Sequence, residues 1–399
     1  MTNSHSPAID QPARLIGDVA AGLAQLILRS GEGITELAAE LHAAIVRGAL
    51  IAAPAVPDAI AVPPPYRIVA QSFSLLARLA AALPRRGDDT VAPDHWLRFI
   101  SALNGVVGDK LAEWDNPLAI AMHVRDADGA ALTAADWHGA ARAGAVLFVH
   151  GLCTSERKWH TPSHRALVSE LQAAGYGVGW LRYNSGRAVA DNGAELADLL
   201  EAQCGGDEPA PQLILIGHSM GGLVVRSACH WAAVRRHSWL RRLTHAAYLG
   251  TPHRGAPLER AGNIFNELLG RTAYSAPFMR LGNIRSRGIK DLRFGCIAPD
   301  ADSRHSSVPL AGHVRHLLVA ASRQPPAGAT WIGDGFVPVH SALGQHPDQT
   351  LALAAAQLQR EHLSPLGHIA LMGDRRTCEV LRAWLGLAPQ SHQDTKGFI

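Results

Sequence analysis

One serine in this sequence stands in a pattern that could make it a nucleophile. The pentapeptide Gly217-His218-Ser219-Met220-Gly221 follows the apolar run 213–216 and precedes a helical pattern that begins at Gly222. A serine on a sharp turn between a strand and a helix needs small residues two positions before and after it. The pattern therefore predicts a nucleophile elbow at Ser219, and a glycine-bounded turn without chemistry is the alternative.

A nucleophilic serine also needs amide groups that stabilise an oxyanion. The N–H of Met220 is one candidate, because the first amides of a helix are oriented toward a developing negative charge. A second donor is expected in the loop after an early strand, where His150-Gly151-Leu152 follows the apolar run 146–149. The N–H of Leu152 is the candidate, and a tight turn without a catalytic role is the alternative.

The serine hydroxyl further requires an imidazole to accept its proton and a carboxylate to hold the imidazole tautomer. Asp334 is the candidate acid, because a glycine on each side lets the backbone place it at a strand end. His368, in a loop before the last predicted helix, is the candidate base. His340 and His346 also follow the acid, as does His362 in a polar stretch with a helical pattern, but order and loop placement favour His368.

Four residues beside these motifs are candidates for contact with the substrate. They are His150, His218, Thr251 and Tyr183. For the loop that contains Tyr183, a purely structural hydrogen-bonding role is an equally good interpretation.

Short apolar runs alternate with helical patterns from residue 118 onwards. This alternation is typical of a largely parallel sheet covered by helices on both faces. The predicted strands are 119–124, 146–149, 178–182, 213–216, 246–249 and 316–320. The predicted helices are 163–174, 193–203, 221–234 and 377–385. The sequence therefore predicts an α/β fold that places Ser219 between a strand and a helix.

The chain divides into three predicted parts. Residues 1–117 form a helical N-terminal region, because apolar residues recur at helical spacing in 15–27, 34–45, 68–83 and 96–111. Residues 118–390 form the catalytic domain, and the tail 391–399 is expected to be flexible. Within the domain, 254–313 exceeds an ordinary connection and predicts a lid-like insertion.

Composition narrows the range of partners and compartments. The 399 residues carry a formal charge of +3 without a basic run, which argues against nucleic acid as a partner. Five scattered cysteines predict free thiols in a reducing, cytoplasmic compartment, and neither a signal peptide nor a transmembrane helix is identified. Peripheral membrane contact through the apolar N-terminal helices is an open alternative. No metal or other cofactor is predicted, because the spacings of metal and phosphate sites are missing.

Several motifs in the same order give the chain a resemblance to lipase-type α/β-hydrolases. It is most similar to the group with a domain like that of the GPI inositol-deacylases, over about 118–387. The motifs are His150-Gly151-Leu152, 217–222, 249–255, 333–338 and Gly367-His368. The resemblance implies an α/β-hydrolase fold, a triad of Ser219, Asp334 and His368, and an oxyanion hole of Leu152 and Met220.

The expected function is hydrolysis of carboxylic esters or lipids through an acyl-enzyme, with a small-molecule ester as the partner. Acyl transfer and hydrolysis of thioesters or amides are alternatives, because the same triad serves them. A non-catalytic scaffold or membrane-associated protein is the alternative from another class.

Overall fold

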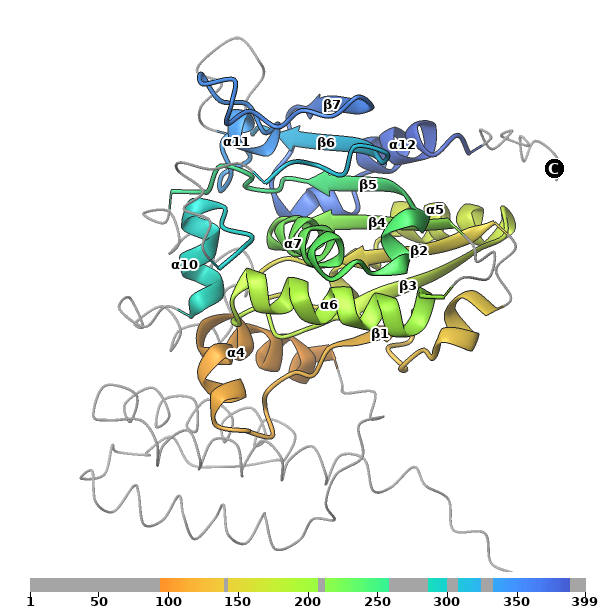
Figure 1. The fold of residues 1–399 in the computed structure, drawn as a ribbon, viewed down its shortest axis with the longest axis vertical. Helices are drawn as coiled ribbons and strands as arrows, with labels where there is room; N and C mark the ends of the chain where they lie inside the picture. Colours follow the sequence, from red (N-terminus) through yellow and green to blue (C-terminus); the bar gives the residue numbers. More distant parts are fainter. Residues whose placement is uncertain are drawn as a thin grey trace, which may run out of the picture.

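A sheet forms the centre of the part of the chain that the structure describes (Figure 1). The structure, a computed structural model, describes residues 94–139, 143–206, 212–257, 286–299, 308–323 and 333–387. Within these ranges one sheet has the order β1-β3-β2-β4-β5-β6-β7. Its strands are β1 (His123–Arg125), β2 (Gly144–Val149), β3 (Tyr176–Arg182), β4 (Gln212–His218), β5 (Leu243–Leu249), β6 (Arg315–Ala321) and β7 (Leu358–Leu363). Only the pairing of β1 with β3 is antiparallel among the described strands, so the predicted α/β class is confirmed.

Helices cover both faces of this sheet. On one face lie α5 (Pro162–Ala173) and α12 (Arg375–Trp384). On the other lie α4 (Asp94–Glu113), α6 (Val189–Cys204) and α7 (Met220–Arg235). Each face of the sheet has its own apolar core, and alternate residues of β2 point into different cores. Val146 and Phe148 are buried in the core beneath α5 and α12, whereas Leu147 and Val149 are buried in the core beneath α4, α6 and α7. Strands buried on both faces need unbroken apolar runs, which makes them visible in the sequence.

Shorter elements connect the main ones. They are η1 (Ala135–Gly139), η2 (Glu156–Trp159), η3 (Ser238–Arg242), α10 (Arg287–Phe294), α11 (Val339–Ala342) and η5 (Ile369–Met372). The sequence does not predict α10, although Ser286 caps its first turn and Gly295 ends it in a left-handed conformation, both ordinary helix signals.

Two predictions of secondary structure are wrong. The strand expected at 119–124 is the short β1, His123–Arg125, so its first residues are not in a strand. The polar stretch around His362, which has a helical pattern, is strand β7. Because β7 is an edge strand whose side chains are exposed or only half-buried, its sequence Leu-Gln-Arg-Glu-His-Leu lacks an apolar run.

Helix α4 packs into the same core as the sheet. Phe99, Leu103, Val107 and Leu111 are buried in one apolar cluster with residues of β2, β4 and α7. The backbone kinks at Val107, where φ is −131° and ψ is 15°. Residues 1–93, with the other predicted N-terminal helices, and the tail 391–399 lie outside the described residues. None of the described helices is long and apolar enough to cross a bilayer.

A carboxylate on α10 caps the N-terminus of α6. The N–H of Val189 donates to Asp291 Oδ2 at 2.8 Å, whereas the N-cap residue of α6 itself, Ala188, has no side-chain acceptor. Burial raises the pKa of Asp291 from 3.8 to about 6, although this hydrogen bond acts in the opposite direction. The contact therefore joins α10 to α6, but burial of the ionised carboxylate destabilises the fold above about pH 6.

We expect Asp291→Asn to stabilise the protein at pH 7.5. Since the folded pKa is raised, the contribution of Asp291 to stability is fully present below pH 3.8 and is lost as pH rises through about 6. Asparagine stays neutral and can still accept the hydrogen bond from Val189. Two pKa units set an upper limit of about 3 kcal/mol for the gain. Urea denaturation should show a smaller gain at pH 5.0 than at pH 7.5, and the reverse order would contradict this assignment.

Candidate active site

Ser219 occupies the turn between β4 and α7. It has φ 54° and ψ −124°, a conformation that is strained for any residue with a side chain. A Cβ at Gly221 would lie 2.5 Å from the His150 carbonyl oxygen, and one at Gly217 would lie 2.5 Å from the Gly222 nitrogen. Both glycines are therefore required by close backbone approaches. The turn places Ser219 at the carboxyl end of β4, where it lines a pocket.

His368 and Asp334 form a buried pair beside this turn. His368 Nδ1 lies 2.7 Å from Asp334 Oδ2, while Asp334 Oδ1 accepts from the N–H groups of Phe336 and Val337, each at 2.9 Å. The Asp334 residue is 0% exposed and His368 is 5% exposed. Three hydrogen-bond donors thus fix the carboxylate, and the carboxylate in turn fixes the orientation of the imidazole.

Two further residues hold the His368 segment in place. His218 Nε2 donates to the His368 carbonyl oxygen at 3.0 Å, and the two imidazole rings lie 4.7 Å apart. Burial, with the neighbouring His368, holds the pKa of His218 well below its ordinary value, so its ring is neutral. Gly250, at φ 58°, lies next to the hydrogen bond between His368 and Asp334. A Cβ at this position would lie 3.2 Å from His368 Nδ1, so a larger residue would crowd the pair.

Ser219 and His368 line one small pocket, whose side chains are mostly apolar. Its empty volume, including the part open to solvent, is about 370 Å³. The lining residues are Gly151, Leu152, Thr154, His218, Ser219, Ala256, Leu292, Phe336, Val337 and His368. Among the described residues, no group of three or more His, Cys, Asp or Glu is placed to hold a metal ion.

The peptide link between Gly151 and Leu152 is fixed through its carbonyl group. The Gly151 oxygen accepts hydrogen bonds from His150 Nδ1 at 2.8 Å and from Thr154 Oγ1 at 2.9 Å. Because a peptide is planar and trans, the N–H of Leu152 points away from this anchored carbonyl. Burial lowers the pKa of His150 to about 4, so the neutral ring carries its proton on Nδ1, as the bond to a carbonyl requires. Met220 directly follows Ser219 and begins α7, where amides lack intrahelical acceptors.

Of the four candidate substrate-binding residues, His218 lines the pocket, whereas the other three are buried and do not line it. Tyr183 stacks on His150 with ring centroids 4.5 Å apart and donates its hydroxyl to the His150 carbonyl at 2.9 Å. Thr251 packs against Gly222 in the first turn of α7, because a Cβ at Gly222 would overlap its hydroxyl. The structure thus brings these three next to the predicted motifs but not into the pocket.

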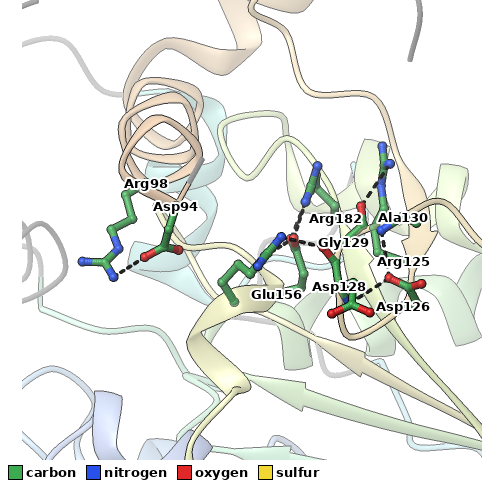
Figure 2. Close-up of polar contacts among 10 residues, drawn as sticks. Asp94, Arg98, Arg125, Asp126, Asp128, Gly129, Ala130, Glu156 and Arg182 are labelled. Carbon is green, nitrogen blue, oxygen red and sulfur yellow. Dashed lines mark hydrogen bonds and ion pairs between the residues drawn. The ribbon is translucent and has the colours of Figure 1, made fainter. Parts of the chain in front are cut away.

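A buried ion pair anchors the far end of the loop that follows β2 (Figure 2). Arg182 on β3 holds both carboxylate oxygens of Glu156, with Nε 3.1 Å from Oε2. Burial alone would raise the pKa of Glu156, but the hydrogen bond and charge of Arg182 outweigh it and the pKa is lowered. Next to this pair, Arg157 donates to the Asp128 carbonyl oxygen at 2.6 Å. The loop is therefore tied to the sheet at residue 156.

Five of the residues that line the pocket are not among the site residues predicted from the sequence. Phe336 and Val337 directly follow the predicted acid, and Thr154 follows Gly151 by three positions, so each lies close to a recognised motif. Ala256 and Leu292 belong to the predicted insertion. Leu292 could have been found through the cap signals of α10, which mark an amphipathic helix with an apolar side.

The chain has matches among protein families and among solved structures. Residues 141–311 match the family model of the PGAP1-like alpha/beta domain. None of the curated proteins matches the sequence. Among solved structures, a lipase from Bacillus licheniformis, BlEst2 in mature form, has 15% identity and a TM-score of 0.39, over 62% of this chain and 93% of that one.

Two other structural matches have a similar extent. Carboxylesterase CesB from Bacillus subtilis has 12% identity and a TM-score of 0.39, over 61% of this chain and 85% of that one. Alpha/beta hydrolase domain-containing protein 10 from mouse has 15% identity and a TM-score of 0.37, over 61% and 88%. The sheet order and the turn at Ser219 describe an α/β fold with a serine between a strand and a helix, and residues 141–311 of this fold are similar to the PGAP1-like alpha/beta domain.

Proposed function

We propose that this chain, which carries a PGAP1-like alpha/beta domain on an α/β-hydrolase fold, is a serine hydrolase that cleaves carboxylic esters. One observation carries the proposal. Ser219 stands on a strained turn at the start of α7 and shares a pocket with His368, whose Nδ1 is hydrogen-bonded to the buried Asp334. A base that lies between a nucleophile and an orienting carboxylate is the arrangement that acyl transfer requires.

The reaction follows from these roles. His368 Nε2 takes the proton of the Ser219 hydroxyl as its oxygen attacks the ester carbonyl carbon. The N–H groups of Leu152 and Met220 stabilise the negative charge on the carbonyl oxygen. When the C–O bond breaks, His368 returns the proton to the departing alcohol and leaves an acyl-enzyme. A water molecule then attacks the acyl group by the same steps in reverse and releases the acid.

The residues around Ser219 support an ester with an apolar acyl group. Leu152, Ala256, Leu292, Phe336 and Val337 supply the aliphatic and aromatic side chains of the pocket. Such a lining favours a hydrocarbon chain through burial of apolar surface. Carboxylic esters and lipid esters are therefore the proposed substrate class.

A panel of matched substrates tests this proposal. The purified protein should hydrolyse p-nitrophenyl esters faster than the corresponding thioester and anilide, and a fluorophosphonate probe should label it. Esters with acyl chains of two to sixteen carbons would show which chain length the pocket prefers. Activity confined to anilides would favour an amidase, and a lack of both labelling and hydrolysis would favour a non-catalytic protein.

A further inference from the structure

Two loops meet next to the proposed second oxyanion donor. We call residues 150–156, after β2, the oxyanion loop, and residues 183–187, after β3, the support loop. In the oxyanion loop, Cys153 has a positive φ of 57° and is buried. Its N–H donates to Ser185 Oγ of the support loop at 3.1 Å. Because Cys153 follows Leu152 directly, this bond fixes the backbone next to the oxyanion donor.

Helix α4 packs against both loops through two glycines on one side. A Cβ at Gly105 would overlap Cys153 Sγ and lie 2.9 Å from Cys153 Cα. A Cβ at Gly108 would overlap Asn184 Oδ1. Glycine destabilises a helix interior, so two glycines three positions apart need a reason. The reason here is that the helix backbone approaches both loops more closely than any side chain would allow.

The kink in α4 adds hydrogen bonds to this contact. Asn184 Nδ2 donates to the Gly108 carbonyl oxygen at 2.8 Å, and Ser286 Oγ, at the start of α10, donates to the Gly105 carbonyl oxygen at 2.7 Å. The kink at Val107 lies between the two acceptors. Side chains that take up main-chain acceptors in this way are a recognised cause of helix kinks. Helix α4 is thus bonded to the support loop and to the helix that carries Leu292 into the pocket.

We propose that α4, which lies outside the segment 141–311 matched by the family model, positions the second oxyanion donor. Gly105 and Ser185 are the positioning residues, and they act through Cys153 on the N–H of Leu152. This inference rests on the proposed function. A displaced Cys153 would rotate the preceding peptide units, and an oxyanion donor acts only within hydrogen-bond distance of the transition state. The effect should therefore fall on kcat and leave KM nearly unchanged.

Two variants in the full-length protein test the proposal. Gly105→Ala should lower kcat for p-nitrophenyl butyrate about 10–100-fold, and Ser185→Ala about tenfold, with KM within about threefold of wild type. Adding Cys153→Ala to Gly105→Ala removes the overlapping sulfur but leaves the contact with the residue 153 Cα at 2.9 Å, so the loss of kcat relative to Cys153→Ala alone should be smaller than the loss that Gly105→Ala causes in wild type.

Gly179→Ala is the matched control. A Cβ at this position in β3 would lie 2.6 Å from Val124 Cγ1, so it is also overpacked, but it lies outside both loops. It should lower the melting temperature without lowering kcat. A merely structural role for Gly105 predicts the same behaviour in both glycine variants, which would overturn the proposal.

Hydrogen–deuterium exchange gives a readout that does not depend on activity. Peptides that span 150–156 should exchange faster in Gly105→Ala and Ser185→Ala than in wild type and Gly179→Ala, while β4 stays protected. Wild-type protein that hydrolyses no ester would contradict the proposed function, and exchange would still test the role of α4. Wild-type exchange in the oxyanion loop of both variants would overturn the inference about α4.

Discussion

Replacement of Ser219 by alanine is expected to lower kcat for p-nitrophenyl esters by about 10⁴-fold or more. The variant removes only the hydroxyl oxygen that would form the acyl-enzyme. Alanine keeps the Cβ, so the strained backbone at φ 54° and the hydrogen bond from the residue 219 N–H to the Leu249 carbonyl oxygen at 2.8 Å are retained. The melting temperature should therefore stay close to that of wild type.

The measurement compares purified wild type, Ser219→Ala and Ser169→Ala in parallel. Ser169 is an exposed serine on α5 whose hydroxyl donates to the Arg165 carbonyl oxygen at 3.0 Å, so its loss should not change activity. Fluorophosphonate should label wild type and Ser169→Ala but not Ser219→Ala. Equal kcat in all three proteins would show that Ser219 has a structural role only.

Asp334→Asn should lower kcat about 10³–10⁴-fold while the protein remains folded. The new amide oxygen can still accept from the N–H groups of Phe336 and Val337, which now bind Asp334 Oδ1 at 2.9 Å. The amide nitrogen then faces His368 Nδ1 and donates to it, so the imidazole proton moves to Nε2. A protonated Nε2 cannot accept the proton of Ser219.

The control for this substitution is Asp348→Asn. Asp348 is an exposed aspartate that accepts hydrogen bonds from Thr350 within a turn and does not line the pocket. Its variant should keep wild-type kcat. The assignment of Asp334 would be refuted if its asparagine variant retained kcat within about tenfold of wild type, because a tautomer change costs far more.

The parts of the fold that could be predicted are those in which the pattern of apolar residues along the chain matches the burial of the element. The inner strands β2, β4, β5 and β6 are buried on both faces, so each is an apolar run that the sequence displays. The strained turn at Ser219 is equally visible, because its glycine-bounded pentapeptide stands directly between an apolar run and a helical pattern. Strand β7 was not predicted, because an edge strand with exposed side chains can have a polar sequence.

The surroundings of the candidate site could be predicted only in part. A motif shows that His150 and Thr251 lie near Ser219, but not on which side of the backbone they lie. In the structure neither of them lines the pocket, and the His150 ring instead donates to the Gly151 carbonyl oxygen. The docking of α4 depends on hydrogen bonds to Gly108 and Gly105 from residues 76 and 181 positions away in the chain. A helical pattern predicts the helix and leaves its place in the fold undetermined.

The close packing of α4 also bears on how this domain can evolve. Gly105 and Gly108 are constrained by Cys153 and Asn184, which belong to the loops that follow β2 and β3 in the chain. Recombination that joined 141–311 to a different N-terminal segment would separate these pairs. A new segment without glycines at the two contact positions could not pack as closely against the loops. We therefore expect the helix and the domain to be inherited together, and substitutions at the two ends of each contact to occur in concert.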